Sequence, residues 1–215
     1  MNHRISPAAR AAGWAGLAGL SLTALVSTLH PGAALAHHPF GMAEAGGMNP
    51  WMGLMSGIGH PLLGPDHLLF LLAIGFVGLR RPLSWVLPLL AAGLLGSAAA
   101  QVLPLAESLT PFAEVLVSLS LVLAGLVALG RVPALALIPA IALHGYLLGG
   151  SVVGAEPTPL ATYFLGLLIS QGALLLIVTA GSRRLMAGVQ ENGRRLLAGI
   201  WIGIGAAFAW TMLVT

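Results

Sequence analysis

Long apolar runs are the feature that most restricts how this chain can fold. Six stretches of about 20 mainly apolar residues follow residue 50, each bounded by Arg, Pro or Gly. A helix of that length crosses the ~30 Å hydrocarbon core of a bilayer. We therefore predict an all-α polytopic membrane helix bundle with about six transmembrane helices. The expected spans lie near residues 51–79, 83–103, 111–130, 132–150, 159–180 and 195–213.

The composition excludes several other classes of protein. Only 7% of the 215 residues are charged, whereas soluble domains carry roughly 25%. All nine basic residues are Arg, and they are too scattered to form a nucleic-acid surface. No Cys is present, so disulfides, iron–sulfur clusters and thiolate metal sites are excluded. Any metal site must use imidazole, carboxylate, amide, backbone or thioether ligands.

The first 36 residues have the pattern of a secretory signal peptide. Two arginines precede an apolar stretch, and Ala34-Leu35-Ala36 forms an A-x-A cleavage site. Cleavage would make residues 37–215 the membrane domain and leave its N-terminus on the outer side. The competing interpretation is an uncleaved additional helix, which the preceding Pro31-Gly32 disfavours.

Arginine positions predict the orientation of the spans. With the mature N-terminus outside, every mature arginine falls in an inner loop, as the positive-inside rule requires. We therefore expect a multi-pass protein of the bacterial inner membrane with a periplasmic N-terminus. The inner arginines are Arg80, Arg81, Arg131, Arg183, Arg184, Arg194 and Arg195, and the outer segments carry only Glu44, Glu107 and Glu156.

Glycine is abundant, with 29 residues. The pairs Gly145/Gly149 and Gly199/Gly203 have GxxxG spacing. Such pairs predict close contact between helices, although the spacing also arises by chance in a Gly-rich chain.

A few ionisable residues lie inside the predicted spans, where they are costly and usually functional. From the 1.5 Å rise per residue, His60, His144 and the neutral Gln171 are expected near the midplane. Glu114 is expected only one turn inside the outer surface, where it would guard an entrance or reach the interface as an isolated residue. The full ionisable set is His60, Asp66, His67, Glu114 and His144.

Three of these residues fall within eight positions of the first span. In an unbroken helix His60 and His67 would stand about 10.5 Å apart along the axis, too far to share one ion. Pro61, Gly64 and Pro65 favour an interrupted helix. We therefore predict that His60, Asp66 and His67 form one metal-selecting site in a broken span, with His144 at similar depth. The alternative is a simple proline kink with histidines hydrogen-bonded across helices.

The same residues carry a family resemblance. His60-Pro61-Leu62-Leu63-Gly64-Pro65-Asp66-His67, after a His-rich start, resembles the HupE/UreJ family of hydrogenase and urease accessory membrane proteins. The resemblance extends to Glu114 with Ser118, to His144-Gly145-Tyr146 and to residues 153–159. The His-x5-Asp-His spacing is also similar to the signature of nickel/cobalt permeases. This resemblance implies uptake of nickel or cobalt for hydrogenase, urease or cobalamin synthesis.

We expect a transport protein rather than an enzyme, with Ni²⁺ or Co²⁺ as cargo and no permanently bound cofactor. Zn²⁺ or copper would be less favoured cargoes. The expected partners are a divalent metal ion and the lipid bilayer, with a homo-oligomer or an energising partner left open and no nucleic acid. No P-loop is present. The alternatives are an intramembrane zinc hydrolase using His60, Asp66, His67 and His144, and a metal-sensing or docking protein without transport.

Two further groups of donors lie near the expected outer surface. His37 and His38, with the amine freed by cleavage, would form a weak metal-capture site. The methionines of residues 42–55 would favour Cu(I) if they bound metal, although Met is also a common apolar filler. They are Met42, Met48, Met52 and Met55.

Overall fold

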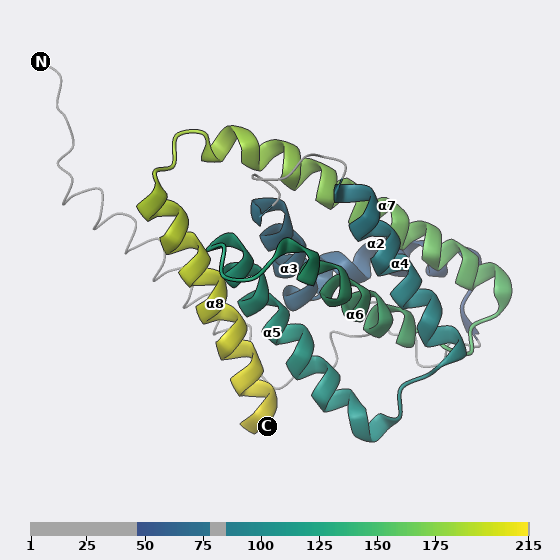
Figure 1. Ribbon diagram of the computed structural model, residues 1–215. Coiled ribbons are helices and arrows are strands. Elements are labelled where there is room, and N and C mark those ends of the chain that lie inside the picture. Colours follow the sequence, from purple (N-terminus) through teal and green to yellow (C-terminus); the bar gives the residue numbers. More distant parts are fainter. Residues whose placement is uncertain (1–46, 78–84, 215) are drawn as a thin grey trace, which may run out of the picture. The chain divides into compact units, whose positions relative to one another are not determined.

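The computed structural model describes residues 47–77 and 85–214, without the side chains of residues 76, 77 and 183–186. The predicted signal peptide, His37, His38, Met42, Arg80 and Arg81 lie outside the described residues. The described part is helical and contains no strand (Figure 1). Its helices are α2 (Pro50–Leu63), α3 (Pro65–Val77), α4 (Val86–Val102), α5 (Thr110–Ala128), α6 (Leu137–Gly150), α7 (Pro157–Met186) and α8 (Glu191–Val214), with the 3-10 turns η5 (Glu107–Leu109) and η6 (Ala134–Ala136).

The helices occupy all six predicted ranges, but not all of them are long enough to cross a membrane. Three continuous segments are long and apolar enough to cross a membrane: Glu107–Ala128, Pro157–Ser182 and Glu191–Val214. The bent pair α2 and α3 qualifies as a fourth when counted as one span. Val86–Val102 and Ala134–Gly150 are shorter apolar helices. At 17 residues, α4 measures about 25 Å, somewhat less than the hydrocarbon thickness. An all-α membrane bundle is confirmed, whereas six crossings stay a prediction.

Glycines allow the helices of each tightly packed pair to approach at backbone distance. In the α4–α6 pair, a Cβ on Gly145 would lie 1.8 Å from Gly93 O, and one on Gly149 would lie 2.3 Å from Ser97 O. The prediction from Gly145 and Gly149 is therefore confirmed. The prediction from Gly199 and Gly203 is wrong for the described part of the chain, where a Cβ on either would meet nothing within 4 Å.

The other close pairs are α2 with α7 and α5 with α8. Figure 1 shows α8, in yellow, running beside α5. A Cβ on Gly125 would lie 2.7 Å from Ala198 O of α8, and one on Gly57 would lie 2.1 Å from Tyr163 O of α7. Helix α3 contacts both α5 and α7. The residues just after the break in the first span are thus held among helices from distant parts of the chain.

The predicted break in the first span is confirmed. Asn49 is the N-cap of helix α2: its side chain accepts a hydrogen bond from Met52 N (2.9 Å). Pro50 lies in the first turn. Helix α2 ends at Leu63, Gly64 has an extended backbone (φ −76°, ψ 110°), and α3 starts at Pro65. The two helices are bent by 71°. The helix continues through Pro61, so the change of direction occurs at Gly64-Pro65.

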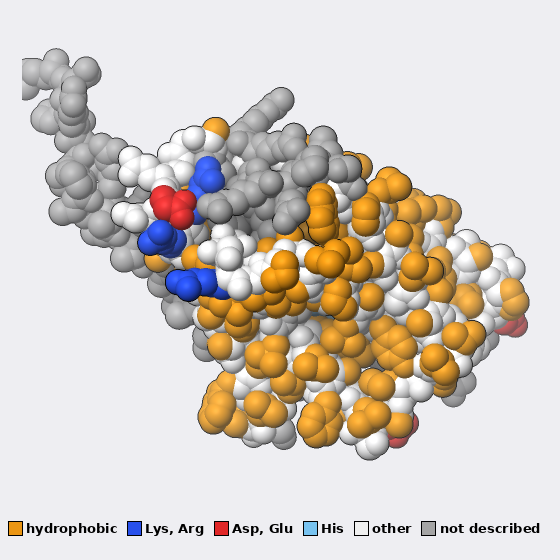
Figure 2. Space-filling view, viewed as in Figure 1, with side chains coloured by type: hydrophobic (Ala, Val, Ile, Leu, Met, Phe, Trp, Pro, Cys, Tyr) orange, Lys and Arg blue, Asp and Glu red, His pale blue; other side chains and the backbone are white. Residues whose placement is uncertain are grey.

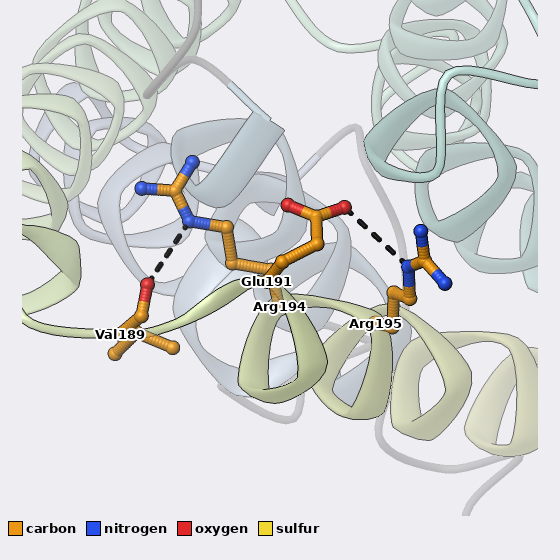
Figure 3. A network of polar contacts seen from close by, with 4 residues as sticks. All are labelled: Val189, Glu191, Arg194 and Arg195. Atoms are coloured by element: carbon orange, nitrogen blue, oxygen red, sulfur yellow. Dashed lines mark hydrogen bonds and ion pairs between the residues drawn. The ribbon is translucent and has the colours of Figure 1, made fainter.

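The surface has the polarity of a membrane protein. Figure 2 shows hydrophobic side chains over most of the visible face, with arginines gathered near the start of α8. Leu87, Leu176 and Trp210 are more than half exposed. At the polar end, Arg195 Nε lies 3.4 Å from Glu191 Oε1, and Arg194 Nε donates to Val189 O (Figure 3). This exposed ion pair contributes at most about 1 kcal/mol to stability.

Candidate metal centre

His67 and His144 form a direct imidazole pair inside the bundle. His67 lies in the first turn of α3 and His144 lies in α6, and their Nδ1 atoms are 2.8 Å apart. Both rings are buried, with 3% and 4% of their surface exposed. The Phe70 ring stacks on His144, with 4.1 Å between ring centroids. The break at Gly64 starts α3 in the direction that brings His67 to α6.

The hydrogen bonds around His144 determine its tautomer. Ser120 Oγ donates its single hydrogen to Val117 O, so it accepts from His144 Nε2, 2.7 Å away. The neutral ring therefore has an unprotonated Nδ1, which accepts from His67 Nδ1–H. It follows that Nε2 of neutral His67 carries a lone pair. A hydrogen bond that fixes the distal nitrogen in this way is typical of metal-binding histidines.

His60 lies in a second polar group, formed with α6 and α7. Its Nδ1 is 3.2 Å from Tyr163 Oη and 3.3 Å from Ser151 Oγ. Both hydroxyls donate to Leu148 O at 2.7 Å, so His60 Nδ1–H is the remaining donor. In the neutral ring, Nε2 is then the unprotonated nitrogen. Of the imidazole pair, His67 thus keeps an unprotonated Nε2, whereas the lone pair of His144 Nδ1 is engaged by the His67 N–H.

His67 lies between the two polar groups. Its ring centroid is 6.3 Å from that of His60 and 4.9 Å from that of His144. A Cβ on Gly64 would lie 2.9 Å from His67 Cδ2 and 3.5 Å from Asp66 Oδ1. The ring edge next to Nε2 and the half-buried carboxylate therefore both lie close to Gly64. The missing glycine side chain leaves room for both groups.

A proline in α2 creates a polar contact with α7. Pro61 has no N–H to donate to Gly57 O, four residues earlier in the helix. Ser170 Oγ donates to that carbonyl instead, at 3.2 Å. The serine thus replaces the hydrogen bond that proline removes, as transmembrane helices require.

A cavity of about 10 Å³, the size of one water molecule, lies next to the imidazole pair. His67, His144 and Gln171 are its polar lining residues, and the rest of its lining is apolar, including Pro61. Gln171 is 2% exposed, and its Nε2 has no hydrogen-bond partner within the described structure. Leaving a buried donor unpaired costs roughly 1–3 kcal/mol.

The predicted ligands are only partly brought together. His67 contacts His144 and lies beside Asp66, whereas His60 is hydrogen-bonded to Tyr163 and Ser151. Within residues 47–77 and 85–214, no group of three or more His, Asp or Glu side chains is close enough to hold a metal ion. A single site of His60, Asp66 and His67 stays a prediction. So does the entrance role of Glu114, in the second turn of α5, and the capture role of His37 and His38 lies outside the described residues.

Several partners were absent from the sequence-based set. Ser120, Ser151 and Tyr163 orient the histidines, although their positions show no motif. The sequence feature that marks these three residues is their polarity, because each carries a hydroxyl in or beside an apolar run. Hydroxyls also bond to their own helix, so polarity alone does not select these three.

The fold and the buried imidazoles define a polytopic helical membrane protein with histidines in its interior. The family model for "HupE / UreJ protein" matches residues 23–208. The chain therefore belongs to the HupE/UreJ family, which has an accessory or transport role with nickel or cobalt. No curated protein and no solved structure matches the chain.

Proposed function

We propose that this protein is a permease that imports Ni²⁺ or Co²⁺ across the bacterial inner membrane for metalloenzyme or cobalamin synthesis. The observation that carries the proposal is the broken first span, which places His67 beside Asp66 and against His144. Half-helices that meet at a polar break are the usual form of ion sites in transporters. Imidazole with a single carboxylate suits first-row divalent ions.

The energetics of an ion inside a bilayer support this donor set. A dehydrated divalent ion at the midplane faces a prohibitive desolvation cost unless protein ligands replace its water. Neutral imidazoles supply donors, and one carboxylate offsets part of the charge. Because only Asp66 is anionic here, the ion is bound weakly enough to leave again.

The imidazole pair suggests how occupancy would change the site. The lone pair of His144 Nδ1 accepts the His67 N–H, so a cation that binds this nitrogen must displace the hydrogen bond. For both Nδ1 atoms to bind one ion, the His67 proton must move from Nδ1 to Nε2. Two nitrogens bound to adjacent positions of one ion stand roughly 3 Å apart, close to the 2.8 Å observed. Metal binding would thus break the hydrogen bond and turn the rings while moving the helices little.

Uptake of radiolabelled nickel and cobalt by expressing cells tests the proposal. Asp66→Asn retains the size of the side chain but removes its charge, and it should reduce uptake to the level of cells without the protein. Glu107→Gln removes one charge from the exposed turn η5 and should leave uptake unchanged. Immunoblotting of membranes verifies equal amounts. Normal uptake by Asp66→Asn refutes the site, and wild-type uptake at background favours a sensing, docking or hydrolytic protein.

The proposed orientation has its own test. Reporter fusions after residue 131 should be active in the cytoplasm, and fusions after residues 107 and 156 on the outer side. A cytoplasmic reporter at residue 156 would contradict the topology.

A further inference from the structure

Gln171 is a buried amide that the helix packing does not use. It lies in α7, 2% exposed, and lines the same cavity as His67 and His144. Its Oε1 faces α4, where a Cβ on Gly93 would be 2.9 Å away. Its Nε2 is buried without a partner among the described residues. A half-turn about χ3 exchanges the two atoms while the rest of the side chain stays in place.

A second glutamine, Gln101, serves helix packing in this bundle. Gln101 Nε2, in α4, donates to Gly149 O of α6 at 2.7 Å. Ser97 Oγ similarly donates to Gly145 O, also at 2.7 Å. These groups join α4 to α6 and are satisfied by backbone carbonyls. Gln171 instead lines a cavity with two imidazoles, and no backbone carbonyl among the described residues satisfies its Nε2.

We propose that Gln171 is a specificity-determining residue that supplies its amide oxygen to the cation bound by His67 and His144. This inference rests on the proposed function and names a further ligand of the same site. A neutral oxygen adds a donor without adding charge, so release of the ion is not slowed by an extra anion. Oxygen beside two nitrogens suits Ni²⁺ and Co²⁺, which accept six ligands, whereas Zn²⁺ is usually satisfied by four.

The test uses the full chain purified in detergent, with Co²⁺ and then Zn²⁺ as probes in equilibrium dialysis. Gln171→Leu should weaken Co²⁺ binding at least about tenfold and Zn²⁺ binding by less than about threefold. Gln171→Glu provides an oxygen at the same reach and should bind Co²⁺ at least as tightly as wild type. Gln101→Leu is the matched control, and it should leave both affinities unchanged.

Thermal unfolding separates a ligand role from a packing role. Without metal, Gln171→Leu should unfold at a higher temperature than wild type, because it removes an unpaired buried amide. Its stabilisation by added Co²⁺ should be smaller than that of wild type. Gln101→Leu should unfold at a lower temperature, because it loses a hydrogen bond between helices.

The outcomes distinguish this inference from the proposed function. If wild type binds Co²⁺ and Gln171→Leu binds it equally well, Gln171 is not a ligand and the permease proposal stands. If Gln171→Leu weakens both metals equally, the specificity claim is wrong. If wild type does not bind Co²⁺ and cells expressing it accumulate neither nickel nor cobalt, both proposals fail.

Discussion

The contact between Ser170 and Gly57 provides a quantitative test of how the first span is stabilised. Ser170→Ala removes the hydroxyl that donates to Gly57 O, a carbonyl that Pro61 leaves without its helical partner. Hydrogen bonds between transmembrane helices contribute about 0.6 kcal/mol on average and at most about 1.7. Loss of this donor inside a closely packed pair should approach the upper end, so we expect the free energy of unfolding to fall by about 1.5 kcal/mol.

The same substitution should be almost harmless once Pro61 is replaced. In Pro61→Ala the new N–H can donate to Gly57 O, so Ser170→Ala should then cost about 0.5 kcal/mol or less. A double-mutant cycle should therefore give a coupling of about 1 kcal/mol. The assay is reversible unfolding of purified protein by SDS in mixed micelles. Distant, independent sites are additive within ~0.3–0.5 kcal/mol, so additivity of this pair would refute the compensation between serine and proline.

Three further perturbations test the packing and the site. Gly145→Ala should lower the free energy of unfolding by about 2–3 kcal/mol, because its Cβ would lie 1.8 Å from a backbone oxygen. Gly203→Ala should be neutral, and equal effects of the two substitutions in the same assay would contradict the packing. Ser120→Ala removes the acceptor that holds the His144 tautomer, and metal uptake should fall about tenfold, an expectation that fails if uptake is unchanged. Glu114→Gln should raise the external metal concentration needed for half-maximal uptake while leaving the maximal rate largely intact, and complete loss would indicate a central ligand instead.

The sequence alone was sufficient for the class of fold and for the break in the first span. Helix length and apolar composition are local properties, so the helical ranges can be predicted without knowledge of tertiary contacts. Pro and Gly act on the backbone of their own segment, and Gly64-Pro65 accordingly interrupts the helix where it was expected. The residue types His, Asp and Gln were identifiable because polar groups are rare and costly in these spans.

Only the tertiary structure determined which groups meet. GxxxG spacing predicted Gly145/Gly149 and Gly199/Gly203 equally, yet among the described residues only the first pair faces a neighbouring backbone. The expected ligands likewise separated into His67 with His144 and His60 with Tyr163, partners 77 and 103 residues apart in sequence. A helical pattern shows which residues share a face, but the partner across that face depends on packing between distant helices. Since each histidine's tautomer depends on such a partner, the chemistry of this site was decided by the assembled bundle.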